Sequence, residues 1–191
     1  MRTVRLYMTM TCDGCFAGPS GELDWMAAAA DPDMNRDVVD LIGDADTAFM
    51  GYPTASGMIP YWHQAAANPA ASEGEHAIAD AVNRVHSLVL SRTEEEIPWD
   101  NAELLIVRDD DQLREAVHAA KNQPGRDIGV PGGIRTAQSF ARLGLIDEYV
   151  FLMHPVALGE GKRIFNRRTN LDLHSAKTYS SGVTRLIYRP R

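Results

Sequence analysis

The chain has 191 residues, of which 45% are hydrophobic and 24% charged, and this is the composition of an ordinary globular protein. The formal net charge of −7 argues against a broad nucleic-acid-binding surface, because such a surface needs clustered Lys and Arg. No apolar run reaches membrane-spanning length, no signal-peptide core precedes the first predicted strand, and two cysteines make no disulfide framework, so we expect a cytoplasmic protein without membrane contact.

The N-terminal quarter predicts a strand, a loop, a helix and a second strand. Apolar and polar residues alternate over residues 4–11, which is typical of a half-buried strand. Asp13-Gly14 then predicts a turn, and residues 18–21 predict a loop. A short apolar strand is expected over residues 47–50. The helix before it is indicated by Met34, Val38, Leu41, Ile42 and Ala45.

The segment from Pro53 to about Glu75 is rich in Pro, Gly, Ala and Ser and contains the adjacent aromatic residues Tyr61 and Trp62. This composition predicts a long loop with room for a helical turn, and loops of this length in compact domains often carry function. A helix is expected next, followed by strands over residues 87–91 and 104–107. The helix is indicated by Ile78, Ala81, Val82 and Val85.

The next part of the chain predicts two helices with a strand between them. Asp110 or Asp111 can cap the first helix, which ends at Pro124-Gly125. A strand over residues 127–130 runs into Pro131-Gly132-Gly133 and the second helix, whose C-terminal cap is Gly144. The apolar residues at helical spacing are Leu113, Ala116, Val117 and Ala120 in the first helix, and Ala137, Phe140 and Ala141 in the second.

Three strands complete the chain. Residues 149–153 are continuously apolar, which is typical of a strand buried on both faces. Ser180-Ser181-Gly182 joins strands over residues 171–179 and 183–188 into a hairpin. Strands and helices therefore alternate before a final hairpin, and we expect an α/β fold with helices on both faces of a mixed, mostly parallel sheet and an antiparallel edge. A single domain over residues 1–191 is the simplest interpretation, because no linker or repeat interrupts the pattern.

The strand–Gly-Gly–helix unit at Gly132 and Gly133 is the strongest local signal of a ligand site. Glycines at the carboxyl end of a strand let the backbone approach a ligand, and the following helix directs free N–H groups and a partial positive charge there. Arg135 and Thr136 could add donors to a bound phosphate or pyrophosphate. An ordinary tight turn is the other interpretation, because the spacing is neither G-x-G-x-x-G nor a P-loop.

Ser91-Arg92-Thr93 is a second candidate, just after another predicted strand. An arginine flanked by two hydroxyls can bind phosphate, because the guanidinium donates a planar fork to an anion. An ordinary polar loop is the alternative interpretation. Ligands of open α/β sheets gather beyond the carboxyl ends of the strands, however, so the two candidate loops support each other.

Other residues give weaker chemical signals. Cys12 and Cys15 have the spacing of a redox motif but lack its strand–Cys-x-x-Cys–helix context. The six histidines show no paired ligand spacing and no serine lies in a G-x-S-x-G context, so we expect neither a metal centre nor a serine hydrolase. Asp13 and Asp24 are candidate proton carriers, although a turn aspartate is the commoner explanation, and a core residue is the commoner explanation for Trp25.

Taken in chain order, several motifs resemble the dihydrofolate reductase family, in the branch similar to the reductase domain of bacterial riboflavin biosynthesis. The most specific are the Gly-Leu-x-Asp-Glu motif at residues 144–148 and the Pro-Val-x-Leu-Gly-x-Gly motif at residues 155–161, which leads to Ile164-Phe165. The others lie at residues 8–18, 49–54, 88–93 and 130–133. Together they span nearly the whole chain.

The resemblance implies a three-layer fold of the dihydrofolate reductase type, NADPH as the hydride donor and a homodimer. It also implies a flat heterocyclic substrate, pterin-like or similar to 5-amino-6-(5-phosphoribosylamino)uracil, lying against the nicotinamide. The substrate would contact Asp13, Trp25, Tyr61 and Trp62. The cofactor residues carried over by motif are Thr9, Met10, Gly51, Thr54, Ser91, Arg92, Thr93, Gly132, Gly133, Ile134, Arg135 and Thr136.

Two departures from the family pattern bear on function. Family members often have Gly-Arg-x-Thr where this chain has Gly51-Tyr52-Pro53-Thr54, so one phosphate-binding arginine is absent, although Tyr52 could stack on the adenine. The riboflavin reductases place an acidic residue before the glycine pair, where this chain has Pro131. Two alternatives therefore stay open beside an NADPH-dependent reductase: a nucleotide-binding homologue with weak or no reductase activity, and a thiol oxidoreductase that uses Cys12 and Cys15.

Overall fold

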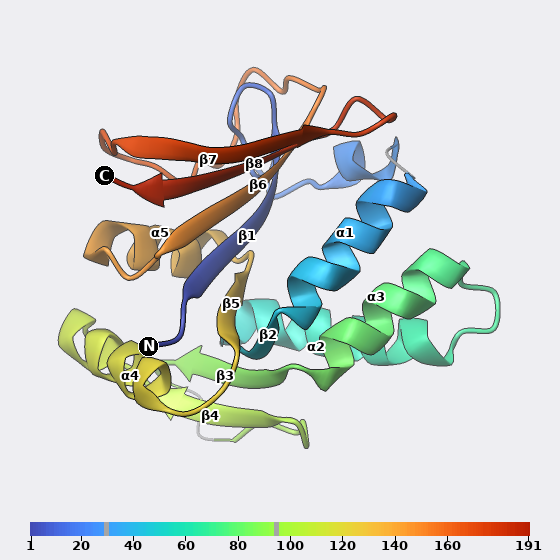
Figure 1. Ribbon diagram of the computed structural model, residues 1–191. Coiled ribbons are helices and arrows are strands. Elements are labelled where there is room, and N and C mark those ends of the chain that lie inside the picture. Colours follow the sequence, from blue (N-terminus) through green and yellow to red (C-terminus); the bar gives the residue numbers. More distant parts are fainter. Residues whose placement is uncertain (29–30, 94–95) are drawn as a thin grey trace.

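The computed structural model describes residues 1–28, 31–93 and 96–191 and contains an eight-stranded sheet (Figure 1). In space the strands lie in the order β4-β3-β2-β5-β1-β6-β8-β7. The pairs from β4 to β6 are parallel, and the two pairs that involve β8 are antiparallel, so the predicted mixed sheet with a hairpin at its edge is confirmed. The strands in chain order are β1 (Val4–Thr11), β2 (Ala45–Gly51), β3 (His86–Ser91), β4 (Ala102–Ile106), β5 (Asp127–Pro131), β6 (Glu148–His154), β7 (Leu171–Thr178) and β8 (Thr184–Pro190).

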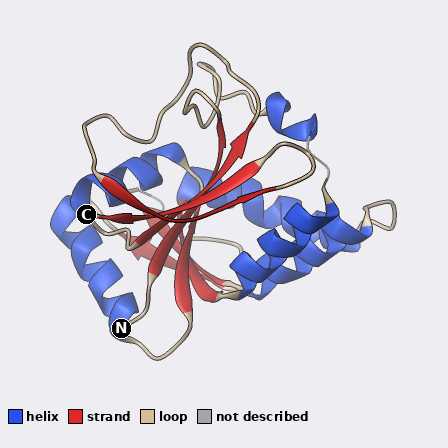
Figure 2. Ribbon diagram, turned by 45° about the horizontal axis from the view of Figure 1, so that its top comes forward, coloured by secondary structure: helices blue, strands red, loops and turns tan. Residues whose placement is uncertain are grey.

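Helices cover both faces of the sheet, which confirms the three-layer fold (Figure 1, Figure 2). A short 3-10 helix, η1 (Asp24–Ala28), precedes the first α-helix. No helix in the described ranges is long and apolar enough to cross a membrane. One face carries α1 (Pro32–Gly43), α2 (Tyr52–Ala67) and α3 (Glu73–Arg84), and the other carries α4 (Asp110–Asn122) and α5 (Ile134–Leu143).

The alternation along β1 builds the larger of two hydrophobic cores. Every second residue from Val4 to Met10 is buried in the core that α4 and α5 cover, while the residues between them are half-buried on the opposite face. In the same core the ring of Phe140 in α5 packs 5.5 Å from that of Phe49 in β2. Burial of such a side chain contributes about 1.5–3 kcal/mol. This core therefore holds α5 firmly against the middle of the sheet.

Most of the segment predicted to be a long loop forms α2 instead, so that prediction is wrong, whereas the helix predicted after it is confirmed as α3. Its loop-like signal came from residues such as Gly57 and Pro60, which both lie inside α2. The helix persists because its apolar side, including Ile59, is buried in a second core over β2 and β3, and burial overrides local propensity. Helix α3 begins with a capping box in which Ser72 and Glu75 exchange hydrogen bonds with each other's backbone N–H.

The N-terminal cap of α4 also differs from the prediction. Asp109, rather than Asp110 or Asp111, accepts a hydrogen bond from the backbone N–H of Gln112, at 2.8 Å. A cap residue needs extended backbone angles, and Asp109 has them with φ −141° and ψ 177°, whereas the two following aspartates are already helical. Asp110 accepts hydrogen bonds from both terminal nitrogens of Arg142 instead, at 2.6 and 2.7 Å.

Asp31 ties the start of α1 to the β7–β8 hairpin. One carboxylate oxygen caps the helix by accepting from the backbone N–H groups of Asp33 and Met34. The other accepts from the Ser180 hydroxyl at 2.7 Å and from the backbone N–H of Ser181 at 3.0 Å. These hydrogen bonds, that of Ser180 first, hold the pKa of the Asp31 carboxyl well below its usual value. The buried carboxylate therefore fixes both segments together.

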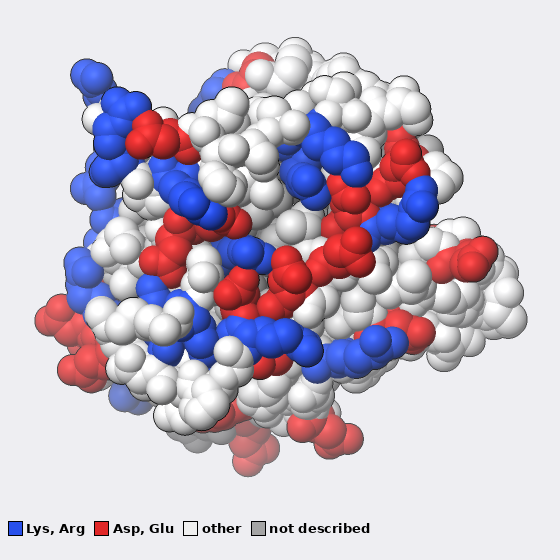
Figure 3. All heavy atoms as spheres, viewed as in Figure 1, with Lys and Arg blue, Asp and Glu red and all other residues white. Residues whose placement is uncertain are grey.

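Asp37 makes a second tie between α1 and the hairpin. Its Oδ2 atom accepts from Lys177 and Tyr179 at 2.7 Å each and from Arg185 at 3.0 Å. Acidic and basic side chains are interspersed over the face that contains α1 and the hairpin, with no broad field of either sign (Figure 3). Helix α1 is thus held as a side wall beside the carboxyl ends of β1 and β6.

Candidate functional site

The parallel strands β1 to β6 share one carboxyl edge, and the segments that follow them meet there. Ligands of open α/β sheets bind beyond this edge. The segments are residues 12–17 after β1, the first turn of α2 after β2, residues 91–93 after β3, residues 107–108 after β4, Gly132 and Gly133 after β5, and residues 155–163 after β6.

Two helix N-termini face each other at the centre of this edge. Gly51 precedes α2 and Gly133 precedes α5, and neither helix has a side-chain cap. A Cβ atom on Gly133 would lie 2.5 Å from Oγ1 of Thr54, and one on Gly51 would lie 2.7 Å from Oγ1 of Thr136. Each threonine hydroxyl therefore covers the cap residue of the opposite helix. We call these residues, together with Gly132, the anion cradle.

The anion cradle suits a phosphate or pyrophosphate. The first turns of both helices have backbone N–H groups without intrahelical partners, and the positive ends of both helix dipoles converge there. Gly132 and Gly133 have φ values of 67° and 75°, which L side chains rarely adopt. Glycine is thus required both by backbone conformation and by the close approach of Thr54.

Two arginines follow the ends of the neighbouring strands β3 and β4. Ser91 is buried at the end of β3, and its carbonyl accepts a hydrogen bond from the N–H of Val107 at 2.8 Å. This contact brings the segment that carries Arg108, which sequence reasoning missed, beside the segment that carries Arg92, and both side chains are exposed. Arg108 follows a predicted strand as Arg92 does, so the sequence contained a signal for it. The sequence could not show that the two segments are neighbours, because the order of the strands in the sheet was unknown. Thr93 is held locally, with its N–H donating to Ser91 Oγ at 3.1 Å.

A clamp connects the loop after β1 to the segment after β6. The Asp13 carboxylate accepts from the Thr11 hydroxyl at 2.5 Å and from the backbone N–H of Gly159 at 2.8 Å. The Asp13 carbonyl accepts from Arg163 at 2.5 Å. These hydrogen bonds, that of Thr11 first, lower the pKa of Asp13. Asp13 therefore stays ionised and orders the loop.

The clamp continues as a short antiparallel bridge. The N–H of Phe16 donates to the carbonyl of Lys162 at 2.7 Å, and the N–H of Lys162 donates to that of Ala17 at 2.8 Å. A Cβ atom on Gly161 would overlap the Ala17 carbonyl oxygen, so the two backbones touch there. The clamp brings the Phe16 ring within 3.8 Å of a Cβ position on Gly132. Phe16 therefore borders the anion cradle on its β1 side.

Trp25 and His154 lie together next to this clamp. The Trp25 ring is buried and meets the His154 ring edge-on, with centroids 5.4 Å apart. Its Nε1 atom is buried and has no hydrogen-bond partner among the residues that the structure describes. Burial lowers the pKa of His154, so the imidazole is neutral near pH 7. Asp24, by contrast, is exposed in η1.

The structure separates several other predicted site residues from the cradle. Tyr61 and Trp62 pack on each other with ring centroids 4.9 Å apart, about 13–15 Å along α2 from its first residue. Met10 points into the larger core, whereas Thr9 is half-buried on the α1 face. Ile134 packs against the larger core, and Arg135 is exposed in the first turn of α5.

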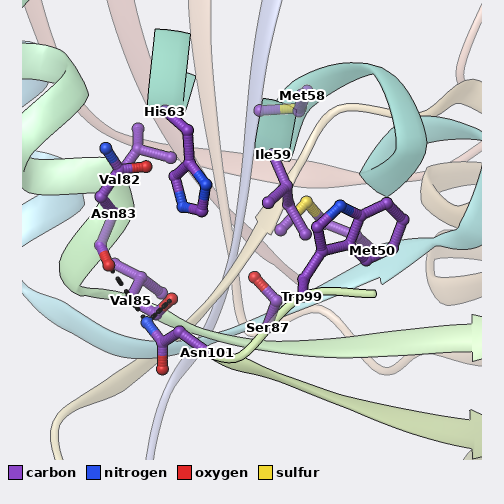
Figure 4. A pocket seen from close by; sticks show the side chains of 10 residues that line it. All are labelled: Met50, Met58, Ile59, His63, Val82, Asn83, Val85, Ser87, Trp99 and Asn101. Carbon is purple, nitrogen blue, oxygen red and sulfur yellow. Dashed lines mark hydrogen bonds between the residues drawn. The ribbon is translucent and has the colours of Figure 1, made fainter. Parts of the chain in front are cut away.

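The two cysteines and the histidines do not form a second reactive centre among the described residues. Cys12 is exposed and Cys15 is buried, and both are free thiols. No group of three or more His, Cys, Asp or Glu in the described ranges could hold a metal ion. A hollow between α2, α3 and the start of β3 is a separate feature (Figure 4). It lies at the opposite end of β3 from Arg92.

Comparison with known proteins agrees with this architecture. The RibD C-terminal domain family matches residues 2–185. The chain is 34% identical over 190 residues to the uncharacterized protein YyaP of Bacillus subtilis. The aligned region covers 98% of this chain and 94% of YyaP.

Two solved structures show the same fold at low identity. A putative riboflavin biosynthesis protein from Shewanella sp. PV-4 superposes with a TM-score of 0.72 at 20% identity, and 99% of each chain is covered. Dihydrofolate reductase from Enterococcus faecalis, solved with NADP(H), has a TM-score of 0.63 at 12% identity, covering 99% of this chain and 96% of that one. The predicted dihydrofolate-reductase-like fold is thereby confirmed.

Proposed function

The chain belongs to the RibD C-terminal domain family, and from this premise we propose that it is an NADPH-dependent reductase of a small flat heterocycle. The anion cradle is the observation that carries the proposal, because two uncapped helix N-termini interlock there through glycines and threonines. A pyrophosphate between them would receive N–H donors from both helices and favourable dipole interactions from both.

The strand order supports one orientation of the cofactor. The cradle follows β2 and β5, the two arginines follow β3 and β4 on one side of it, and Phe16 follows β1 on the other side. With its pyrophosphate in the cradle, NADPH would direct its adenosine phosphate to Arg92 and Arg108 and its nicotinamide to Phe16. The cofactor supplies the hydride when bound, and the chain's own residues bind and orient it.

The substrate would lie beyond the nicotinamide, between Phe16 and the wall formed by α1. We propose a pterin-like substrate or one similar to 5-amino-6-(5-phosphoribosylamino)uracil. Both carboxylate oxygens of Asp13 already accept hydrogen bonds, so its proposed role is to order the loop near the substrate. Of the two candidate proton carriers, Asp24 is the one that is exposed, in η1.

The reductase activity is tested by following NADPH oxidation against a panel of pterins and aminopyrimidines, with and without a ribose phosphate. Turnover of one class supports the proposal and identifies the substrate. Tight NADPH binding without turnover on any member of the panel would favour the alternative of a nucleotide-binding homologue.

Wild type is expected to bind NADPH more tightly than NADH. The two cofactors differ by one phosphate, and a charge-assisted hydrogen bond contributes about 1.5–3 kcal/mol, or roughly ten- to a hundredfold in affinity. Because two arginines are adjacent, Arg92→Ala should reduce the preference in part, and Arg92→Ala combined with Arg108→Ala should remove it. Calorimetric titration of each variant with both cofactors measures the ratio.

Arg84→Ala is the matched control for this experiment, because Arg84 is exposed at the opposite end of β3. It should leave the ratio unchanged. A wild type without preference for NADPH, or a double variant that keeps the preference, would show that the two arginines do not read the phosphate.

We also propose a homodimer formed through the hairpin side of the sheet. The outermost strand, β7, has an unpaired edge, and Leu173 on it is 56% exposed. Exposed edge strands of this kind are natural sites of pairing between chains, and isologous contacts are the commonest arrangement. Light scattering at micromolar concentration should give twice the mass of one chain, and the mass of a single chain would contradict the proposal.

A further inference from the structure

We propose that Tyr52 and Trp99 act together as positioning residues for the cofactor, in an aromatic brace that joins the anion cradle to the connection between β3 and β4. This inference rests on the proposed function, because it concerns the same nicotinamide cofactor. It assigns a role to Tyr52, which stands where related proteins often have an arginine, and to Trp99, which no motif indicated.

The brace spans two parts of the site that are far apart in the sequence. Tyr52 is the first residue of α2 and directly follows Gly51 of the cradle. Trp99 lies near the end of the connection whose beginning carries Arg92. The two ring centroids are 6.1 Å apart with an interplanar angle of 44°, and both side chains pack against the second core. The brace therefore ties the start of α2, next to the cradle, to the end of the β3–β4 connection.

The connection depends on apolar anchors for its position. Residues 96–98 have no regular secondary structure, and Ile97 and Trp99 are the partly buried residues of the described connection that pack against the second core. At its far end Asn101 is fixed, because its Nδ2 atom donates to the carbonyls of Asn83 and Val85, at 3.1 Å each. Among the described residues between Ser91 and Asn101, Trp99 is the one whose ring packs on Tyr52 beside the cradle.

Trp99 also borders a small hollow, where part of its ring lacks packing partners. Trp99 lines the hollow in Figure 4, into which the Ser87 hydroxyl and the edge of the His63 ring also point. The space that water molecules can occupy in the hollow is about 20 Å³. This is enough for roughly one or two water molecules and too little for a cofactor or substrate. A void supplies no packing atoms, so the indole gains little from that side.

The brace predicts a kinetic pattern that differs from that of the arginines. It supports the start of α2 and the β3–β4 connection without contacting the distinguishing phosphate, so its loss should weaken NADPH and NADH equally. An aromatic pair of this kind corresponds to about a three- to tenfold change in affinity. The KM for each cofactor should rise by that factor, while kcat at saturating cofactor stays unchanged, because Phe16 and the clamp are untouched.

The experiment compares Tyr52→Ala, Trp99→Ala and their combination with wild type, by calorimetric titration of both cofactors and by steady-state kinetics. Because the two rings act as one unit, the double variant should bind each cofactor no more weakly than either single variant does. Tyr52→Phe should behave as wild type, since it keeps the ring. Trp62→Ala is the matched control, because Trp62 lies on the same helix in another aromatic pair, away from the cradle.

Two results would overturn the brace: unchanged cofactor affinity in Trp99→Ala, and additive losses of affinity in the double variant. Additive losses would also indicate that Tyr52 contacts the cofactor directly. If circular dichroism shows that Trp99→Ala is unfolded, Trp99→Leu replaces it, because leucine keeps the apolar packing and lacks the ring. A wild type that binds neither cofactor overturns the proposed function together with the brace, whereas normal wild-type binding with unaffected variants overturns the brace alone.

Discussion

Replacing Gly133 with valine is expected to weaken NADPH binding at least a hundredfold. Gly133 has φ 75°, and a β-branched residue is strained at that angle. Its Cβ atom would also lie 2.5 Å from the Thr54 hydroxyl, so α2 and α5 would have to separate. Separation moves two sets of N–H donors away from one anion, and a hundredfold loss corresponds to about 2.7 kcal/mol.

Calorimetric titration with NADPH measures this effect, and circular dichroism checks that the variant is folded. Gly57→Ala is the matched control, because Gly57 lies inside α2 with no atom near its Cβ position. It should bind NADPH like wild type and be slightly more stable, because alanine has the higher helix propensity. A folded Gly133→Val variant with wild-type affinity would exclude the cradle as the pyrophosphate site.

Replacing Gly161 with alanine is expected to break the clamp and lower kcat by ten- to a hundredfold. The added Cβ atom would overlap the backbone carbonyl oxygen of Ala17 and lie 3.1 Å from the Cβ and Sγ atoms of Cys15. A backbone carbonyl cannot rotate away as a side chain can, so the loop after β1 must shift and carry Phe16 with it. Overpacking of this kind costs about 1–3 kcal/mol of stability.

Steady-state kinetics and thermal unfolding test the second prediction together. A loss of about 1–3 kcal/mol corresponds to a lower Tm by roughly 2–12 °C for a chain of this size. Affinity for the adenosine half, measured with adenosine 2′,5′-bisphosphate, should stay near wild type because the two arginines follow β3 and β4, on the other side of the cradle from the clamp. Gly43→Ala, at an open position at the end of α1, is the control. Wild-type kcat in Gly161→Ala would show that the clamp does not position the reacting groups.

Sequence patterns predicted the structure correctly where it depends on residues that are close together in the chain. The alternation of β1 was predicted because period-two spacing buries one face of a strand whatever the fold around it. The cap at Gly144 was predicted because a φ of 68° favours glycine at a helix end. The glycine pair at the end of β5 was recognised for the same reason, since its conformation is a local requirement.

Sequence patterns failed to predict the structure where it depends on packing between residues far apart in the chain. The segment from Pro53 to about Glu75 contains Gly57 and Pro60 and was predicted as a loop, yet burial of Ile59 against β2 and β3 makes α2 a helix. The roles of Gly161 and Asp13 were also invisible, because both depend on residues on the other side of the clamp, more than 140 positions away in the case of Asp13 and Gly159. No local window contains such contacts.

The sequence by itself determined the fold class, the family and the glycine and arginine segments that carry the proposed cofactor site. Only the tertiary structure decided which of these segments meet. It placed Thr54 over Gly133, the segment of Arg108 beside that of Arg92, and Tyr52 against Trp99, and it set Tyr61 apart from the cradle. The physical reason is that the strand order, β4-β3-β2-β5-β1-β6, depends on the packing of whole sheet faces. Segments that are neighbours at the carboxyl edge are therefore far apart in the sequence.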